Sequence, residues 1–295
     1  MKKGVTKKEH QRNLKRFKKA VEESNVVLRK AGMWDKNSQA QGTTSVEIFP
    51  DVAALTAAAG ERFVRVAQDA VARRGVFTVA LSGGSTPKGL YTLMAKDKNL
   101  CGDIPWSKIH FFFGDERQVP PDQADSNFHM VNQAMFQRLA PGLTHIHRIL
   151  GEFADAAEAA SRYEVDMRDF FESHGLVEAG FPRFDLIFLG MGSEGHTASL
   201  FPESLALQET HRWVVANWVE KFKAHRITMT FPVLNNAAEV VLLVAGVAKA
   251  PIVVEVLERT ATTPRYPVQR VKPCNGTKCW MLDKAAASQL AKVDA

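Results

Sequence analysis

Between residues 46 and 295, short apolar runs alternate with longer amphipathic stretches, and this alternation is what most narrows the choice of fold. The runs expected to form strands are 45–49, 76–82, 107–116, 184–190, 212–219, 226–231, 239–246 and 278–283. The main stretches with helical spacing are 52–74, 156–175 and 249–260. Nearly continuous apolar strands separated by helices are typical of a mostly parallel sheet that is covered on both faces. We therefore expect one α/β domain over 46–295 with a single doubly wound sheet, a modified Rossmann-like arrangement. Asp51 and Asp125 are expected to cap helix starts, and Gly75 to end the first helix.

The first 45 residues differ from the rest in charge. They hold 12 Lys and Arg against 4 Asp and Glu, whereas the whole chain has a net charge of +6, so the remainder is slightly acidic. The segment is interpreted as a basic extension, partly helical or disordered. As a helix it would place Leu14, Phe17, Val21 and Leu28 on one side. A solvated appendage is expected; a helix for a membrane surface or an acidic partner and a transit peptide are alternatives, and Met33 offers an alternative start.

Composition also narrows the partners and the compartment. Because the basic residues gather in the extension, no nucleic-acid partner is expected. No apolar run approaches the ~20 residues that span a membrane, and no secretory signal is recognised. Cys274 and Cys279 flank a turn and are expected to be reduced, with pairing across the turn as the alternative. A cytoplasmic location follows from the low cysteine count. A monomer is favoured, although the oligomeric state stays open.

One glycine-rich segment, "SGGSTPKGL" at 82–90, follows an apolar run and leads into a helix. Gly83 and Gly84 let the backbone approach a ligand closely, and Ser85 and Thr86 add hydroxyl groups. The free N–H groups of a helix start favour an anion such as phosphate. A plain strand-to-helix turn is the alternative. The segment lacks the Gly-Lys-Ser/Thr of a Walker loop, so no nucleotide is inferred.

Two cations stand where they can serve the same anion. Arg226 opens the run at 226–231, and Lys249 follows the run at 239–246. Arg binds phosphate through two parallel hydrogen bonds, and Lys binds it as a point charge.

The segment "GMGSEGHTASLFP" supplies the candidate acid–base group, His196. Imidazole titrates near neutral pH, so it can take a proton from water and return it to a leaving group. Gly192 and its neighbouring glycines allow close backbone approach, and their N–H groups are candidates for stabilising an oxyanion. The segment "GDER" adds Asp115 and Arg117 at another strand end. Because ligands of open α/β sheets bind beyond the carboxyl ends of the strands, we expect these segments to converge there.

Other chemistries find little support in the sequence. His145 and His147 fall on one face of an expected strand, but no third ligand is spaced with them, so no metal site is expected. "GMGSEG" fits the dinucleotide pattern, yet no acidic residue follows at the required spacing. No Ser–His–Asp or Cys–His set can be read from spacing, which argues against a covalent nucleophile.

Taken together, the segments "ALSGGSTPKGLY", "FFFGDERQVPPDQADSNF", "FDLIFLGMGSEGHTASLFPESLAL" and "HRITMTFPVLNNAAEVVLLVAGVAKA" resemble the 6-phosphogluconolactonase family in type and order. The resemblance runs from about residue 46 to the end. It implies hydrolysis of 6-phospho-D-glucono-1,5-lactone to 6-phosphogluconate, the second step of the oxidative pentose phosphate pathway, without a metal or an organic cofactor.

The resemblance also implies roles for particular residues. His196 is the general base that activates water and then protonates the ring oxygen. Asp115 and Arg117 contact the sugar or fix the site, and Lys221 matches a family lysine upstream of the arginine. Glu194 stands where the family usually has Asp, so its carboxylate is displaced by ~1.5 Å, about one C–C bond. The phosphate is assigned to Gly83, Gly84, Ser85, Thr86, Arg226 and Lys249.

Two rival readings remain open. The related glucosamine-6-phosphate deaminases follow the histidine with "IAFNEP", whose Glu assists proton transfer, whereas this chain has "TASLFP". A non-catalytic sugar-phosphate-sensing domain with the basic arm as a DNA-binding head is the other. The arm offers one helix where a helix-turn-helix needs two that pack together.

Overall fold

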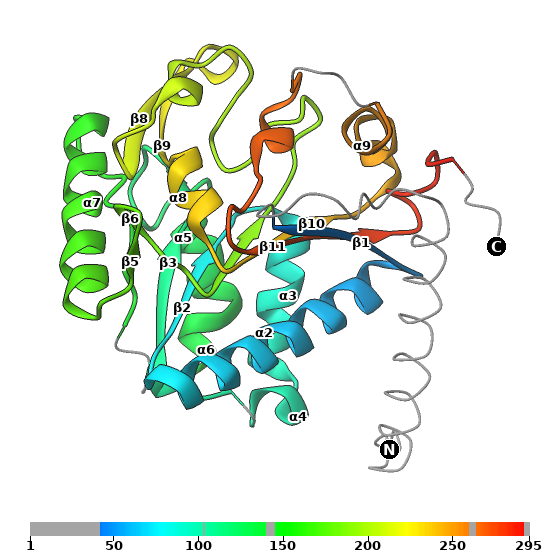
Figure 1. The fold of residues 1–295 in the computed structure, drawn as a ribbon, viewed down its shortest axis with the longest axis horizontal. Coiled ribbons are helices and arrows are strands. Elements are labelled where there is room, and N and C mark those ends of the chain that lie inside the picture. The colour runs from blue at the N-terminus through cyan, green and yellow to red at the C-terminus, as the bar shows by residue number, and fades with distance from the viewer. Residues whose placement is uncertain (1–41, 103, 140–144, 260–263, 292–295) are drawn as a thin grey trace.

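A parallel six-stranded sheet forms the centre of the computed structural model, which describes residues 42–102, 104–139, 145–259 and 264–291 (Figure 1). Its strands lie in the order β1-β11-β10-β7-β2-β3, and every neighbouring pair is parallel. Their bounds are β1 Thr43–Phe49, β2 Phe77–Leu81, β3 Ile109–Phe113, β7 Leu186–Leu189, β10 Glu239–Val244 and β11 Thr277–Asp283. The expected α/β fold with a mostly parallel central sheet is thereby confirmed.

Two smaller sheets complete the strand inventory of the described residues. β4 (Asp115–Arg117), β9 (Ala224–Met229) and β8 (Val214–Val219) form an antiparallel sheet, and β5 (Val177–Glu178) pairs with β6 (Phe181–Pro182). The expectation of a single sheet was therefore wrong in one respect. The runs at 212–219 and 226–231 form a hairpin in a separate antiparallel sheet and not strands of the central one. The expected strand at 107–116 also breaks at Gly114, where the chain leaves β3 and enters β4.

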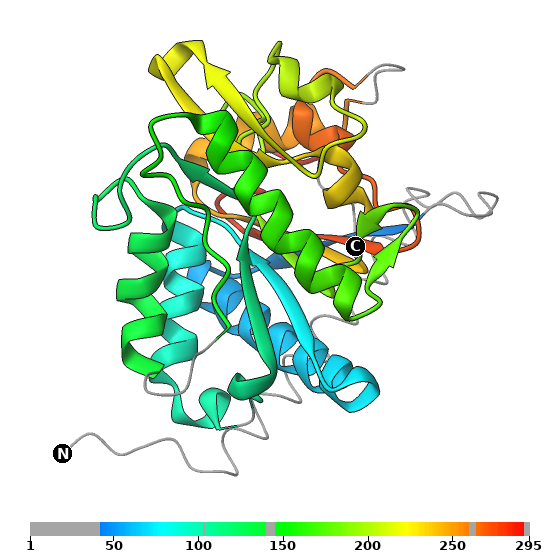
Figure 2. The ribbon, with the colours of Figure 1, turned by 90° about the vertical axis from the view of Figure 1, so that its left-hand side faces the viewer.

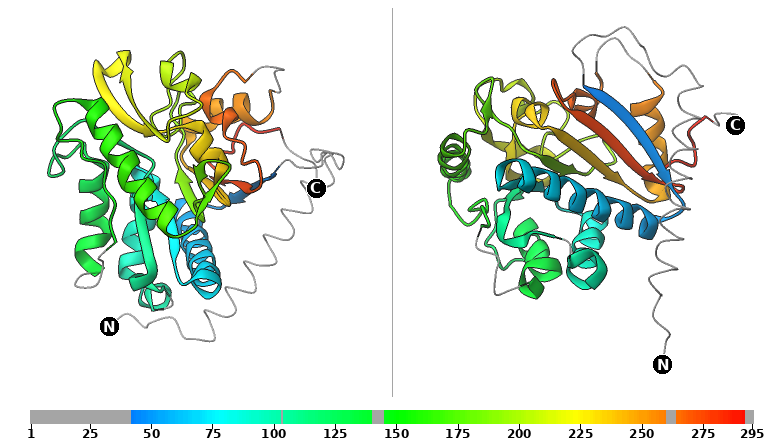
Figure 3. Two further views of the ribbon diagram at one scale, coloured as in Figure 1. Left: turned by 60° about the vertical axis from the view of Figure 1, so that its left-hand side comes forward. Right: turned by 60° about the horizontal axis from the view of Figure 1, so that its bottom comes forward.

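Helices cover both sides of the central sheet. α2 and α3 lie along one side and α9 along the other (Figure 3), while α7 packs beside the β8–β9 hairpin (Figure 2). The α-helices are α2 Val52–Arg74, α3 Ser85–Lys96, α4 Lys98–Cys101, α5 Asn127–Val131, α6 Gln137–Leu139, α7 Ala156–Ser173, α8 Phe231–Asn236 and α9 Ala250–Leu257. Shorter turns are the π-helical η2 Asn132–Phe136 and the 3-10 turns η1 Trp106–Lys108, η3 Leu205–Gln208, η4 Glu220–Phe222, η5 Val247–Lys249 and η6 Pro267–Arg270.

Local capping chemistry explains where the main helices begin and end. Asp51 accepts the N–H of Ala54, and Gly75 ends α2 in the left-handed conformation, as expected. The cap of α5 differs from the expectation, because Ser126 and not Asp125 accepts the N–H of His129. Serine and aspartate are both favoured as N-cap residues, so the sequence alone did not distinguish Ser126 from Asp125.

The hydrophobic core fills the space between the sheet and its helices. The strands β2 and β7 are buried along their whole lengths, and Phe63 of α2 packs edge-on against Phe77 of β2 with ring centroids 5.2 Å apart. Cys274 is exposed and Cys279 is buried, and both are free thiols, so the alternative of a disulfide between them is excluded. Within the described residues, no helix is long and apolar enough to cross a membrane. The expectations for residues 1–41 lie outside the described part of the chain.

Candidate active site

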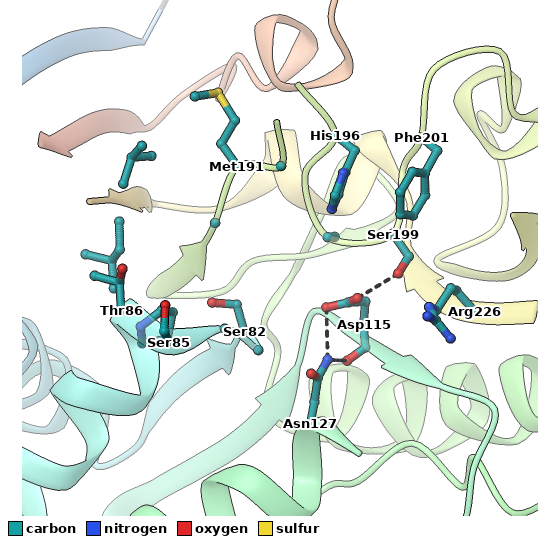
Figure 4. A pocket seen from close by; sticks show the side chains of 18 of the residues that line it. Ser82, Ser85, Thr86, Asp115, Asn127, Met191, His196, Ser199, Phe201 and Arg226 are labelled. Atoms are coloured by element: carbon teal, nitrogen blue, oxygen red, sulfur yellow. Dashed lines mark hydrogen bonds between the residues drawn. The ribbon is translucent and has the colours of Figure 1, made fainter. Parts of the chain in front are cut away.

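A cavity of about 330 Å³ opens at the carboxyl ends of the central strands (Figure 4). Segments after β2, β3, β7 and β10 all reach it, so the expected convergence of these strand ends is present. The expected site residues that line it are Gly83, Gly84, Ser85, Thr86, Asp115, Arg117, Gly192, His196, Arg226 and Lys249. Glu194 and Lys221 do not line the cavity; Glu194 lies next to His196, and Lys221 pairs with Glu194.

The segment after β2 brings a helix start to the cavity wall. α3 begins at Ser85, directly after Gly84, and the first backbone bond of the turn runs from Lys88 N to Gly84 O. The N–H groups of Ser85 and Thr86 therefore have no partner within the helix, and both residues line the cavity. Only glycine fits at 83, because a Cβ there would lie 2.0 Å from Oδ1 of Asn127.

Two arginines stand side by side on the antiparallel sheet. Arg117 of β4 and Arg226 of β9 are register partners, a like-charge placement that is unfavourable without an anion. Burial, followed by repulsion from Arg117, lowers the pKa of Arg226. Arg117 donates to the main-chain oxygen of Asp125, whereas Arg226 stacks 5.2 Å from the ring of Phe222 and has no ion-pair partner within the described residues. Figure 4 shows Arg226 across the cavity from Ser85 and Thr86.

Lys249 lies at the junction of η5 and α9, in the segment that follows β10. Its Nζ donates to the main-chain oxygen of Met191 at 2.7 Å. Burial lowers its pKa, and the charge of Glu194 partly offsets this. The lysine thus brings a positive charge close to the loop that carries His196.

His196 lines the cavity with its ring closely packed. The ring stacks on Phe201 with centroids 4.1 Å apart. Only a glycine fits at 192, because a Cβ there would lie 2.1 Å from Cε1 and Nδ1 of the imidazole. Burial lowers the pKa of His196, with Glu194 and Asp115 acting in the opposite direction. The imidazole is therefore neutral near pH 7, the form in which it can accept a proton.

Glu194 connects His196 to the hairpin between β8 and β9. Its Oε2 lies 3.4 Å from Nδ1 of His196, longer than a normal hydrogen bond but close enough for charge interaction, and Nδ1 is otherwise unpartnered within the described residues. Its Oε1 accepts from Nζ of Lys221 at 2.8 Å. Burial opposes ionisation, but the bond from Lys221, with Ser193 and the charge of His196, holds the pKa of Glu194 at about 2.

Asp115 is held in place by two neutral side chains. Oδ2 accepts from the hydroxyl of Ser199 at 2.7 Å, and Oδ1 accepts from Nδ2 of Asn127 at 3.3 Å (Figure 4). Nδ2 of Asn127 also donates to the main-chain oxygen of Asp115 at 2.9 Å. The residue is only 7% exposed. Both oxygens of the carboxylate are thus oriented by uncharged side chains.

Glu116, the neighbour of Asp115 in "GDER", has a structural position. Its carboxylate accepts the N–H groups of Arg117, Asn127 and Phe128 and the hydroxyl of Ser126, at 2.7 to 3.0 Å. It therefore ties β4 to the first turn of α5 and does not face the cavity. Burial raises its pKa, against the effect of these hydrogen bonds.

Two of the glycine N–H groups expected to stabilise an oxyanion are engaged in the loop itself. Gly192 N donates to the main-chain oxygen of His196 at 2.9 Å, and Gly195 N donates to Gly192 O at 3.0 Å. These bonds shape the loop that presents His196.

Of the cavity-lining residues that were not singled out from the sequence, five have polar or aromatic side chains. They are Ser82, Asn127, Ser199, Phe201 and Phe222. Each is of a residue type that is common in cores and turns, so none of them stood out in the sequence. Their roles depend on contacts between elements, for example Asn127 of α5 with Asp115 of β4, which no sequence spacing encodes.

The segment "HIH" contributes no strand, because Ile146 makes only an isolated bridge to Phe111. His145 and His147 instead approach His110, whose ring centroid lies 4.2 Å from that of His145. Within the described part of the chain, no group of three or more His, Cys, Asp or Glu side chains is placed to hold a metal ion.

Comparison with known proteins shows which family the chain belongs to. The family model described as glucosamine-6-phosphate isomerases/6-phosphogluconolactonase matches residues 50–280, and the chain belongs to this family of sugar-phosphate enzymes. A relative from Nostoc sp. named 6-phosphogluconolactonase is 39% identical over 247 residues, which cover 84% of this chain and 98% of the relative. A Synechocystis sp. protein of the same name is 41% identical over 222 residues, 75% of this chain and 88% of that protein.

A solved structure agrees with these sequence relatives. The 6-phosphogluconolactonase from Trypanosoma cruzi superposes with a TM-score of 0.72 at 30% identity, covering 86% of this chain and all of that one. The resemblance noted in the sequence is thereby confirmed.

Proposed function

We propose that this chain hydrolyses 6-phospho-D-glucono-1,5-lactone to 6-phospho-D-gluconate, with His196 as the base that activates water. The enzyme class, a hydrolase of the 6-phosphogluconolactonase type in the pentose phosphate pathway, is confirmed by the relatives. The roles of individual residues are our proposal. The observation that carries it is the imidazole of His196, stacked on Phe201 and closely approached by Gly192, in a cavity also lined by Arg117, Arg226 and Lys249.

The phosphate of the substrate binds at the start of α3. The free N–H groups of Ser85 and Thr86 and their hydroxyls supply directional donors, and Gly83 and Gly84 leave room for the oxygens. Lys249 and Arg226 supply charge. Because Arg226 has no ion-pair partner within the described residues, its long side chain is free to turn across the cavity toward a bound dianion.

The chemical step starts with proton transfer to His196. The charge of Glu194, 3.4 Å from Nδ1, favours the tautomer with its proton on Nδ1, which leaves the lone pair of Nε2 for the water proton. The water oxygen attacks C1 of the lactone, and a tetrahedral intermediate forms. When the bond between C1 and the ring oxygen breaks, the imidazolium returns its proton to that oxygen. The charge that develops on the carbonyl oxygen is balanced by the positive charges that line the cavity.

Asp115 and Arg117 position the sugar. The anchored carboxylate of Asp115 accepts hydrogen bonds from ring hydroxyls, and Arg117 donates to oxygens on the same side. Both stay in place because β4 is held between β9 and α5.

The residue at position 201 favours the lactonase hypothesis over the deaminase hypothesis. Counted from His196, the position of the glutamate in "IAFNEP" is taken here by Phe201, which stacks on the imidazole and lies 5.9 Å from the ring of Phe222. An apolar ring cannot transfer a proton, so this site favours a reaction that needs one acid–base group. A retained acid–base site likewise disfavours a purely sugar-sensing domain.

The remaining expectations stay proposals. We assign the chain to the cytoplasm and expect a monomer, a basic extension at 1–45 and no nucleic-acid partner. The small-molecule partner is the sugar-phosphate lactone, in keeping with the family.

The test follows the loss of freshly generated 6-phosphogluconolactone above its spontaneous hydrolysis. Wild type should accelerate the loss, and His196→Ala should bring it close to background, a drop of about 10²–10⁴-fold, which is the usual contribution of a general base. His211→Ala, at an exposed histidine, is the matched control and should behave as wild type. No acceleration by folded wild type would exclude the lactonase. Full activity of His196→Ala would move the role of base to another residue.

A further inference from the structure

A second cavity, of about 260 Å³, lies at the other end of the central sheet. Its walls come from the last turn of α9, the first residues of β11 and the segment around η6. Thr44 and Lys278 are register partners near the amino ends of β1 and β11, whereas the active site lies beyond the carboxyl ends. The two cavities are therefore separated by the length of the strands.

Lys278 is the unusual residue of this second cavity. It is only 8% exposed, and its Nζ makes one hydrogen bond, to the main-chain oxygen of Val271 at 2.9 Å. No carboxylate of the described residues pairs with it. An ammonium group has three donors, and a buried lysine without an acidic partner is rare. Burial, followed by the charge of Lys272, lowers the pKa of Lys278 to about 8, so the amine is still mainly protonated at neutral pH.

The surroundings of Lys278 add positive charge. Lys272 lines the same cavity with an exposed side chain, and Arg259 does so while paired with Glu255 at 2.7 Å. Among the described lining residues there is no Asp or Glu. The amide of Gln269 is engaged by the N–H groups of Arg265 and Tyr266 and by Val256 O, so it does not compensate the charge.

We propose that this cavity binds a phosphate monoester of a small metabolite, with Lys278 and Lys272 on the phosphate. Two point charges and spare ammonium donors suit a compact dianion. The volume exceeds that of phosphate alone, and Val256, Leu257 and Trp280 offer apolar wall to the remainder of the molecule. The ligand supplies the counter-charge that the fold omits at Lys278.

Such a ligand would act on the enzyme without competing for its substrate. β11 connects Lys278, near its start, to Asp283 at its end. The carboxylate of Asp283 accepts the N–H of Gly246 at 3.0 Å. Gly246 begins the turn that carries Lys249 into the active site. Binding at Lys278 therefore stabilises the strand that also supports Lys249.

Calorimetric titration of the full chain with inorganic phosphate, at constant ionic strength, tests the proposal. Wild type should bind phosphate at two sites. Lys278→Met, an apolar replacement of similar length, should lose one of them or weaken it about tenfold or more, as expected for a lost charge-assisted bond. Arg226→Gln should weaken the other site. Lys108→Met, at an exposed lysine of η1, is the control and should keep both.

Further measurements guard against misfolded variants. Lys272→Gln, at an exposed side chain, repeats the titration should Lys278→Met fail to fold. Circular dichroism reports the folding of every variant, because Arg226→Gln is expected to lower lactone hydrolysis even when folded. Unchanged phosphate binding in both lysine variants overturns the proposal. So does a wild type whose single phosphate site is lost in Arg226→Gln. Benzoate replaces phosphate in a last arm, and binding of benzoate without binding of phosphate overturns the assignment to a phosphate ester.

Discussion

At the scale of the residue, the imidazole of His196 depends on two successive contacts. Glu194 faces Nδ1 at 3.4 Å, and Lys221 holds Glu194 from the tip of the hairpin at 2.8 Å. Glutamate here is one methylene longer than the aspartate usual in the resemblance. The ion pair with Lys221 fixes the position of this longer side chain, so the carboxylate still reaches the ring.

This arrangement predicts an effect on turnover more than on substrate binding. Glu194→Gln should lower kcat by about 10–100-fold, the range for groups that orient a working residue, with little change in KM. Lys221→Met should have a smaller effect in the same direction. Steady-state rates of both variants are compared with Glu203→Gln and Lys223→Met, exposed residues of the same segments. A rise in KM at constant kcat would instead assign Glu194 to substrate binding.

The pH profile gives an independent measure of the same residue. A base works only when it is deprotonated, so activity falls as pH drops through its pKa. Because burial lowers the pKa of His196, the plateau of kcat/KM should extend below pH 6.5, the ordinary histidine value. In Glu194→Gln the acid limb should move to still lower pH, since the charge that favours imidazolium is gone. An acid limb above pH 6.5 would contradict a buried, neutral base.

Sequence patterns located the assigned residues but not their anchors. His196 and the glycine loop stand at strand ends, where chemistry is expected, so they could be picked out. Asn127 and Ser199 could not, because their role exists only once α5 and the segment after β7 meet Asp115. The pairing of Arg117 with Arg226 likewise depends on an antiparallel register that the sequence did not indicate.

At the scale of the element, the short helix α5 is held by one buried carboxylate. Glu116 accepts two N–H groups of its first turn, from Asn127 and Phe128, and the hydroxyl of its cap, Ser126. Glu116 itself is 2% exposed. Because Asn127 also orients Asp115, the stability of this element and the geometry of the site are joined.

Replacing this carboxylate should therefore cost stability and activity together. Glu116→Gln keeps one acceptor oxygen but places an amide among donors, and should lower the free energy of unfolding by roughly 1–3 kcal/mol. Urea denaturation measures the loss, and lactone hydrolysis should fall in the folded variant as well. Asp51→Ala, which removes the cap of α2 far from the cavity, should cost about 1 kcal/mol without changing kcat. Equal activity of Glu116→Gln and wild type would separate α5 from the site.

At the scale of the whole molecule, the parallel sheet was predictable because its strands are buried on both faces and read as unbroken apolar runs. The apolar runs of β8 and β9 were predicted to belong to the central sheet for the same reason, and this prediction was wrong. Their apolar residues, such as Val214 and Ile227, are fully buried, yet by the antiparallel layer and α7 and not within the central sheet. Apolar content reports burial and does not say which sheet provides it.

A cluster of histidines joins that α7 layer to the central sheet. His110 of β3 stacks on His145 and on Phe170 of α7, with both centroid distances 4.2 Å. Its Nδ1 lies 3.1 Å from Nε2 of His147, whose Nδ1 is 2.9 Å from Asp166. When Asp166 accepts the Nδ1–H of His147, Nε2 of His147 is left to accept from Nδ1 of His110. A further proton on the cluster would place two N–H groups face to face.

The cluster predicts how the stability of the fold depends on pH. Burial, followed by His145, His147 and His174, lowers the pKa of His110 to about 3, against a partial offset by Asp166. The unfolded chain, with an ordinary value near 6.5, binds more protons over this interval, so stability should fall as pH drops from about 6.5 toward 3. Urea unfolding at pH 7.5 and at pH 5 measures the loss. His110→Phe keeps an aromatic ring and should lose less stability between the two values, whereas His211→Phe, at an exposed histidine, should follow wild type. An equal loss in His110→Phe and wild type would show that His110 does not set the acid sensitivity of the fold.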